Sequence, residues 1–127
     1  MLIDAFMFYN ELDVLELRLT ELDPYVDQFV LVEAEVNHVG GDKPLFFKEN
    51  TERFGKWLHK IRYVLITKEA APTDKNPWSR EKFQREAIMS GIQDAPDDAI
   101  IMISDVDEIP DMSKVPFEKM PAVFLAL

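Results

Sequence analysis

Apolar residues along this chain form short continuous runs, separated by stretches with helical spacing. The runs are short enough for mostly buried strands, and they occupy residues 2–9, 28–34, 61–66 and 99–104. The stretches between them predict three helices, one from Asn10 to Pro24, a short one from Asn50 or Thr51, and one from Asn76 to about Ile92. The pattern therefore predicts strands and helices in alternation.

The predicted helix boundaries carry residue types that begin and end helices. Asn10 is expected to cap the first helix, and Asp13 then lies in its first turn, where the helix dipole favours an anion. Pro24 ends this helix, whereas Asn76 followed by Pro77 predicts an N-cap with proline at the first helical position. The residues expected to face inward on the short middle helix are Phe54, Trp57 and Leu58.

This alternation favours a mostly parallel sheet with right-handed crossovers. We therefore predict an α/β fold, a single domain over residues 1–127 with a mostly parallel, Rossmann-like sheet and flanking helices. The last apolar run, 122–127, is expected to be a fifth strand at which the domain is cut off, and an exposed edge there is expected to favour self-association. Ligands of such sheets bind beyond the carboxyl ends of the strands, so the site is expected there.

Charge and composition exclude several classes of function. The 127 residues include 14 basic and 24 acidic side chains, and a net charge of −10 has the wrong sign for gripping nucleic acid over a broad surface. Without cysteine, disulfide frameworks and thiolate metal sites are excluded. No apolar run approaches the length of a membrane span, and residues 1–9 lack the basic start of a signal peptide, so we expect a cytoplasmic chain.

A dense group of acids follows the fourth predicted strand, in Ser104-Asp105-Val106-Asp107-Glu108. Residues two apart in an extended segment point to the same side, so Asp105 and Asp107 are expected to converge while Val106 packs the other way. Converging carboxylates repel unless a cation lies between them, and Mg²⁺ is commonly held by one or two carboxylates plus substrate phosphates. The motif therefore predicts a divalent-cation site for a phosphate ester, unless these acids are only solvated turn residues.

Two polar residues of the third predicted helix, Arg80 and Gln84, lie near the centre of its apolar face on a helical wheel of about 100° per residue. A crossover helix begins at the carboxyl edge of the sheet, so Arg80 is expected to point toward the same rim as Asp105. An inward guanidinium needs either a buried carboxylate, such as Glu33, or a ligand phosphate or base. The sequence leaves both partners open.

Four blocks of sequence resemble glycosyltransferase family 17, the bisecting N-acetylglucosaminyltransferases of N-glycan processing and their microbial and viral relatives. The blocks are residues 4–13, 29–34 with the loop around Gly41 and Pro44, 78–85 and 104–110. Their order and spacing match, and the resemblance extends almost from end to end of the chain. It implies a GT-A fold, of which this chain is expected to be the donor-binding half.

The resemblance also implies an activity, an inverting, metal-dependent transfer of N-acetylglucosamine from UDP-N-acetylglucosamine to a glycan or glycoprotein acceptor. It implies that Asp105 and Asp107 hold Mn²⁺ or Mg²⁺ on the donor diphosphate, with Asp105 also contacting the nucleotide sugar. The other residues that it implies for nucleotide-sugar binding are Tyr9, Asn10, Glu11, Glu33, Arg80 and Gln84. The sequence does not identify the catalytic base, for which Glu108 and Asp111 are candidates; Asp111 also suits the cap of a following helix.

Two other functions stay open. One is a non-catalytic or partial sugar-nucleotide-binding domain, because the chain ends soon after the acidic motif. The other is a phosphatase of the haloacid dehalogenase type, in which an Asp-x-Asp after an apolar strand supplies a nucleophile and a general acid. In this chain the motif lies near the end, which leaves no room for the later lysine and acidic motifs of that class.

Overall fold

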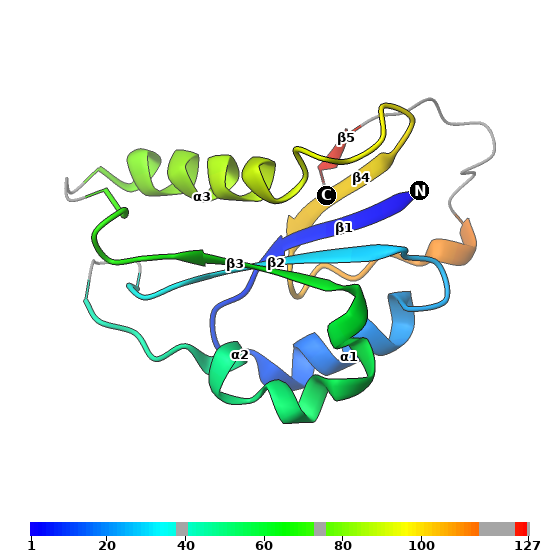
Figure 1. Cartoon of the computed structure of the whole chain (residues 1–127), viewed down its shortest axis with the longest axis horizontal. Coiled ribbons are helices and arrows are strands. Elements are labelled where there is room, and N and C mark those ends of the chain that lie inside the picture. The colour runs from blue at the N-terminus through cyan, green and yellow to red at the C-terminus, as the bar shows by residue number, and fades with distance from the viewer. Residues whose placement is uncertain (38–40, 73–75, 115–123, 127) are drawn as a thin grey trace.

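The computed structural model describes residues 1–37, 41–72, 76–114 and 124–126 (Figure 1). The strands are β1 (Leu2–Met7), β2 (Gln28–Ala34), β3 (Ile61–Ile66), β4 (Ile100–Asp105) and β5 (Phe124–Ala126). The helices are α1 (Leu12–Leu22), α2 (Phe46–Glu49), α3 (Pro77–Gly91) and the two 3₁₀ helices Thr51–Lys60 and Met112–Lys114. Over these ranges, no helix combines the length and apolar character that a membrane crossing requires.

The strands form one sheet in the order β3-β2-β1-β4-β5, and each neighbouring pair is parallel. Four strands of six or seven residues form its body, and the three-residue β5 pairs with β4. The predicted parallel α/β fold is confirmed. The chain adds β2 and β3 on one side of β1 and then β4 on the other, so the strand order reverses between β1 and β4. Their carboxyl ends are adjacent, with Met7 paired to Asp105.

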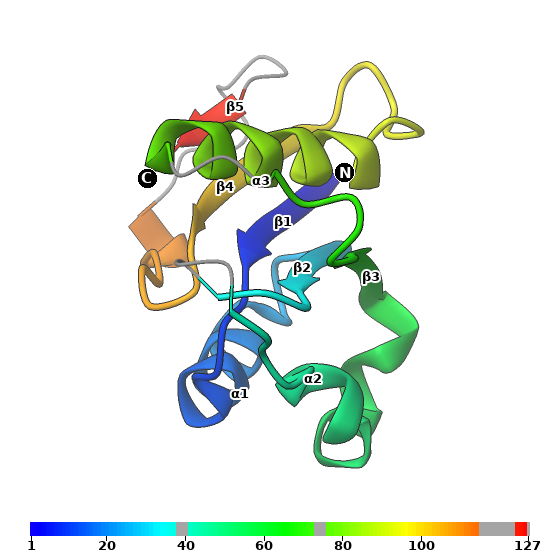
Figure 2. The ribbon, with the colours of Figure 1, turned by 90° about the vertical axis from the view of Figure 1, so that its left-hand side faces the viewer.

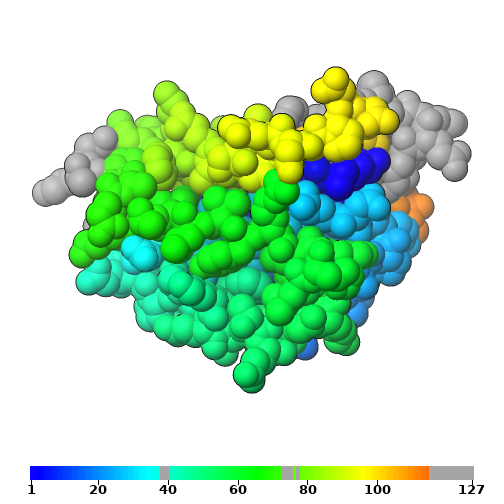
Figure 3. Space-filling model, in the orientation of Figure 1, coloured from blue at the N-terminus to red at the C-terminus, as the bar shows by residue number. Residues whose placement is uncertain are grey.

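Helices cover both faces of the sheet, with α1, α2 and the 3₁₀ helix Thr51–Lys60 on one side and α3 on the other (Figures 1 and 2). Successive residues of β1 point to opposite faces: Leu2 and Phe6 pack in the core beside α1, whereas Ile3 and Ala5 pack in the core beside α3. Burial on both faces explains the continuous apolar runs. In the space-filling view, the segment that contains the 3₁₀ helix and β3 forms much of one surface (Figure 3).

The segment before β3 differs from the prediction. Helix α2 was not predicted, and Thr51–Lys60 forms a 3₁₀ helix with a kink at Phe54. Phe54 and Trp57 are buried as predicted, but Leu58 is 41% exposed, so that part of the prediction is wrong. The reason is the period: with three residues per turn, Phe54 and Trp57 share one face and Leu58 is turned away from it.

The first predicted helix cap is also corrected. Helix α1 has Glu11 rather than Asn10 at its N-cap, and no side chain there bonds a helix amide. The Glu11 carboxylate instead accepts the amide N–H of Asn10 at 2.7 Å. By contrast, Asn76 caps α3 as predicted, with its side-chain oxygen accepting the amide N–H of Trp78 at 3.0 Å.

Helix α3 approaches the sheet closely at its last residue, Gly91. A Cβ atom on this residue would lie 2.6 Å from Val30 Cγ1 and 3.1 Å from Val64 Cγ2. Valine methyl groups are fixed to a branched carbon and cannot swing away as the tip of a long side chain does. The contact between α3 and the sheet therefore requires glycine at this position.

Gly91→Ala is expected to lower the free energy of unfolding by about 1–3 kcal/mol, the usual range for overpacking a core. Urea denaturation followed by circular dichroism measures this change. Gly55→Ala is the matched control, because no heavy atom lies within 4 Å of the Cβ that it would add. Its stability should equal or exceed that of the wild type. If Gly91→Ala were as stable as Gly55→Ala, the close approach of α3 would be contradicted.

Candidate functional site

A cavity of about 360 Å³ opens beyond the carboxyl ends of β1, β2 and β4. This is the point at which the strand order reverses, where parallel sheets commonly bind ligands. Its walls come from the end of β1, the loop after β2, the middle of α3 and the acidic segment at the end of β4. The lining residues are Met7, Phe8, Tyr9, Glu11, Ala34, Val36, Asn37, Lys43, Gln84, Asp105, Val106 and Asp107.

The cavity brings together most of the residues predicted to bind the metal ion or the nucleotide sugar. Those that line it are Tyr9, Glu11, Gln84, Asp105 and Asp107. Arg80 lines a small adjoining cavity, which shares Asn37 and Gln84 with the first. Asn10 is exposed, Glu33 is fully buried, and neither is among the lining residues.

The acidic segment has the alternation expected of it. Asp105 and Asp107 are exposed and line the cavity, whereas Val106 is 3% exposed and packs in the core on the α1 side of the sheet. The segment closes as a tight turn, because the amide N–H of Glu108 donates to the carbonyl of Asp105 at 3.0 Å. In return, Glu108 Oε1 accepts the amide N–H of Asp105 at 3.0 Å.

The electrostatics of this turn are unfavourable. Partial burial, followed by repulsion from Glu108 and Asp107, raises the pKa of Asp105 above its ordinary value, and the more distant charge of Arg18 only partly opposes this. The Asp105 carboxylate therefore carries negative charge that the protein does not fully neutralise. A bound cation would relieve it.

The two candidates for the catalytic base lie in different places. Glu108 lines a groove beside the cavity, and the two share Gln84 and Asp105. Asp111 instead lines a separate cavity with Tyr25, where its side chain accepts the amide N–H and hydroxyl of Ser113. Asp111 thus has the helix-capping role that the sequence allowed for it.

Glu33 affects the cavity indirectly, through Lys43. Its carboxylate accepts the Tyr63 hydroxyl at 2.8 Å, the Phe47 amide at 3.0 Å and the Lys43 ammonium group at 3.4 Å. Burial and then the bond to Glu33 raise the pKa of Tyr63, which keeps its hydroxyl protonated as a donor. Lys43 in turn lies 5.3 Å from the centroid of the Tyr9 ring, which lines the cavity. These bonds hold Glu33 away from the ligand space.

Two functional candidates beneath the cavity were not predicted, Asp4 on β1 and Arg18 on α1. Both are 0% exposed, and the Arg18 Nη2 atom lies 2.6 Å from Asp4 Oδ1. A signal existed in the sequence. Asp4 alternates with Leu2 and Phe6 on one face of a strand, and Arg18 lies at helical spacing from Leu15 and Leu22. Opposite charges on two buried faces that pack together are expected to form an ion pair.

A divalent cation fits the chemistry of the acidic turn but would need ligands from elsewhere. In the part of the chain that the structure describes, no group of three or more histidine, aspartate or glutamate residues is arranged to hold a metal ion. Asp105 and Asp107 offer oxygen atoms on one wall, and Glu11 lies on the same cavity. Mg²⁺ bound by one or two carboxylates completes its coordination with water and substrate phosphates.

Comparison with known proteins identifies a family. The sequence profile of glycosyltransferase family 17 matches residues 1–122. The chain is 29% identical over 124 residues to the beta-1,4-mannosyl-glycoprotein 4-beta-N-acetylglucosaminyltransferases of Rattus norvegicus and Homo sapiens, and 28% identical to that of Mus musculus. Each match covers 93% of this chain and 23% of the relative, so the chain spans about a quarter of these proteins. No solved structure matches.

Asp105→Asn is expected to stabilise the fold at neutral pH. Folding raises the pKa of Asp105, so its protonated form favours the folded state. This contribution to stability is complete below the unfolded pKa, about 3.9, and is lost as the pH rises through the folded pKa. Because Asp105 is exposed, the gain should be small, about 0.5 kcal/mol at pH 7, and should vanish near pH 4. Thermal denaturation between pH 7 and pH 4 measures it.

Asp98→Asn is the control for that measurement. Asp98 is an exposed aspartate just before β4, at the opposite edge of the sheet, so the net charge changes equally. An equal gain in both variants would attribute the effect to net charge and not to the acidic turn.

Proposed function

The chain belongs to glycosyltransferase family 17, and we propose that its cavity binds the UDP-N-acetylglucosamine donor of a glycosyl transfer, with Mn²⁺ or Mg²⁺ between the donor diphosphate and Asp105 and Asp107. One observation carries the proposal: two carboxylates line one cavity at the point where the strand order reverses. The choice of sugar and of a glycan or glycoprotein acceptor is supported by the names of the relatives.

The rest of the cavity suits a nucleotide sugar in size and chemistry. Its volume of about 360 Å³ lies within the usual range for small-molecule sites. The aromatic ring of Tyr9 and the apolar Ala34 and Val36 offer packing surface, and the Glu11 carboxylate and Gln84 amide offer polar contacts. We assign these residues to the nucleoside and sugar, with Arg80 approaching from the adjoining cavity.

The chemistry follows from where the charges lie. The divalent ion, when bound, supplies a Lewis acid that neutralises charge on the departing diphosphate. Asp105 and Asp107 would hold it at the end of β4, and the bond from the Asp105 amide to Glu108 keeps the turn closed around them. We propose transfer with inversion, which requires a base for the acceptor hydroxyl. Glu108 is the better placed candidate, since its groove adjoins the cavity.

Titration calorimetry of the chain with UDP-N-acetylglucosamine, with and without Mn²⁺, tests the donor site. Binding is expected only with the metal, and the Asp105→Ala, Asp107→Ala double variant should weaken it at least about 10-fold, as expected when metal ligands or their partners are lost. Asp97→Ala, Asp98→Ala is the matched control, because it removes the same charge at the opposite end of β4. This control should bind as the wild type does.

Two outcomes would overturn the proposal. Equal binding by the two double variants would show that the nucleotide sugar does not use the acidic turn. Trapping of an aspartyl-phosphate mimic at Asp105 by a fluoride-metal complex would instead indicate a phosphatase. If the donor binds but is not consumed in the presence of acceptor glycopeptide, this chain has the binding function without transfer.

A further inference from the structure

One buried guanidinium, that of Arg18, lies under the acidic turn and joins it to β1, β4 and α1. We propose that Arg18 is a positioning residue that fixes the backbone of residues 105–108 before any cation or nucleotide binds. The inference rests on the proposed function only for what the turn binds. The shape of the turn is a separate question, which can be measured without a ligand.

On one side, Arg18 binds the backbone of the turn. Its Nη1 atom lies 2.7 Å from the carbonyl oxygen of Glu108, 3.1 Å from that of Asp105 and 3.4 Å from that of Val106. Three carbonyl groups from four consecutive residues thus point at one nitrogen atom. An arrangement of this kind specifies the path of the backbone and hence the directions in which its side chains leave.

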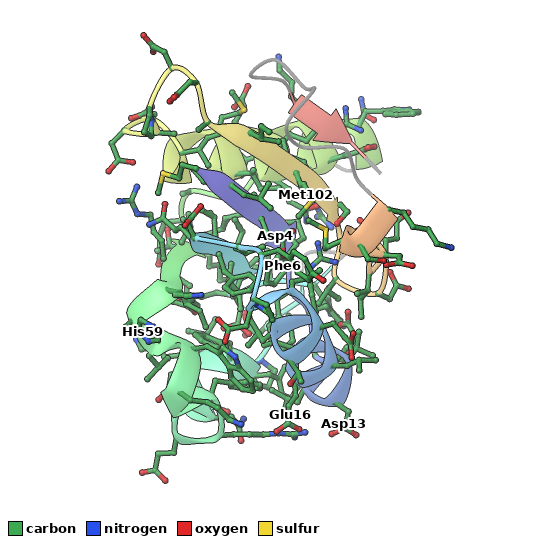
Figure 4. All side chains as sticks on the ribbon, turned by 90° about the vertical axis from the view of Figure 1, so that its right-hand side faces the viewer. Asp4, Phe6, Asp13, Glu16, His59 and Met102 are labelled. Atoms are coloured by element: carbon green, nitrogen blue, oxygen red, sulfur yellow. The ribbon has the colours of Figure 1, made fainter. Side chains whose placement is uncertain are left out.

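On the other side, Arg18 is held by the sheet. Its Nε and Nη2 atoms donate to the two carboxylate oxygens of Asp4 at 2.8 and 2.6 Å, and Nη2 also donates to Ser104 Oγ at 2.7 Å. The guanidinium lies 4.9 Å from the centroid of the Phe6 ring. Figure 4 shows Asp4 and Phe6 on β1, between the sheet and α1. Each nitrogen of the guanidinium therefore has a partner, and the group cannot swing without breaking several bonds.

The turn needs such an anchor because its own side chains repel one another. Asp105, Asp107 and Glu108 are all exposed carboxylates within four residues. Among the described residues, the positive charge that acts on Asp105 is that of Arg18, and it offsets the repulsion only in part. The contacts within the turn are the two bonds between Asp105 and Glu108 and a long one, 3.4 Å, from Ser104 Oγ to the Glu108 carbonyl. Arg18 supplies the positive charge and the donors from below.

Lysine cannot replace arginine in this position. An ammonium group presents three donors from a single atom, whereas the guanidinium presents five in a fixed plane. Arg18→Lys keeps the charge opposite Asp4 but cannot also reach the carbonyl groups of the turn and Ser104. This variant therefore separates charge compensation in the core from control of the turn.

The first measurement is amide hydrogen exchange by NMR on metal-free, nucleotide-free protein. In Arg18→Lys, the Glu108 amide, which donates to the Asp105 carbonyl, is expected to exchange at least about 10-fold faster, whereas amides of the β2–β3 pairing keep their wild-type rates. Mn²⁺ affinity measured in the presence of UDP should fall 10- to 100-fold, as for other residues that support metal ligands.

Arg62→Lys is the matched control. Arg62 also bonds a carboxylate and a backbone carbonyl, those of Asp94 and Gly91, but at the opposite edge of the sheet. Its substitution should leave both readouts unchanged. Ser104→Ala is the second probe, because it removes one link to Arg18, together with the long 3.4 Å bond from Ser104 Oγ to the Glu108 carbonyl, and leaves the pair with Asp4 intact. It should accelerate exchange of the Glu108 amide about 3-fold, and it decides the question if Arg18→Lys does not fold.

The proposal is overturned if a folded Arg18→Lys keeps the wild-type exchange rate at Glu108, or if Ser104→Ala does so when Arg18→Lys is unfolded. It is also overturned if exchange rises uniformly across the sheet, which would make Arg18 a general stabilising residue. A wild-type chain that binds neither Mn²⁺ nor UDP would contradict the proposed function, and the exchange rates would still decide the role of Arg18.

Discussion

The buried ion pair between Asp4 and Arg18 is the interaction on which the rest of this structure depends. Removing two such charges from water costs several kcal/mol for each, and only close geometry with further hydrogen bonds offsets it. Burial raises the pKa of Asp4, and the hydrogen bonds and charge of Arg18 oppose that shift. The remaining donors of Arg18 then point at the Ser104 hydroxyl and at the carbonyl groups after β4. One pair thus ties the central strand, the first helix and the acidic turn together.

A second buried carboxylate follows the same principle at the other wall of the cavity. Glu33 on β2 draws Lys43 inward from the loop, and Lys43 lies against the ring of Tyr9. In both places a buried acid on the α1 side of the sheet holds a basic side chain, Arg18 or Lys43, and this side chain supports a wall of the cavity. The exposed carboxylates of the turn have no such internal partner of full strength. The repulsion that Glu108 and Asp107 exert on Asp105 is therefore expected to lower stability at neutral pH, and a functional site commonly carries a cost of this kind.

The sequence was informative wherever a repeating pattern was present. The apolar runs located the four main strands to within about two residues, and the period of two separated Asp105 and Asp107 from Val106. Leu58 was misplaced because its helix is 3₁₀, whose period is shorter than the one assumed. Glu33 was expected near the ligand, although its position on a buried strand already favoured partners inside the core.

Arg18 and Lys43 were missed for different reasons. Arg18 lies on a regular helical face, and its partner Asp4 is 14 residues away, so each residue looked like an isolated exception until the two faces were considered together. Lys43 lies in a loop, where no period indicates which way a side chain points. Its position depends on Glu33, Phe46 and the chain path between them, and such contacts are available only from a structure.

The anchored backbone of the acidic turn and its exposed carboxylates have different roles in the proposed binding of a cation. Because Arg18 holds the backbone of the turn, a cation that arrives there does not have to order it, and the affinity is not reduced by that loss of conformational freedom. The Asp105 carboxylate, by contrast, is only partly compensated by Arg18 in the absence of a cation. The proposed binding of a cation would therefore remove a repulsion that Asp105 experiences in the folded chain, and by mass action it would stabilise the fold as well as the site. A site for a cation and a diphosphate requires a backbone that is already rigid and carboxylates whose negative charge is not balanced by the protein. The acidic turn combines these two properties.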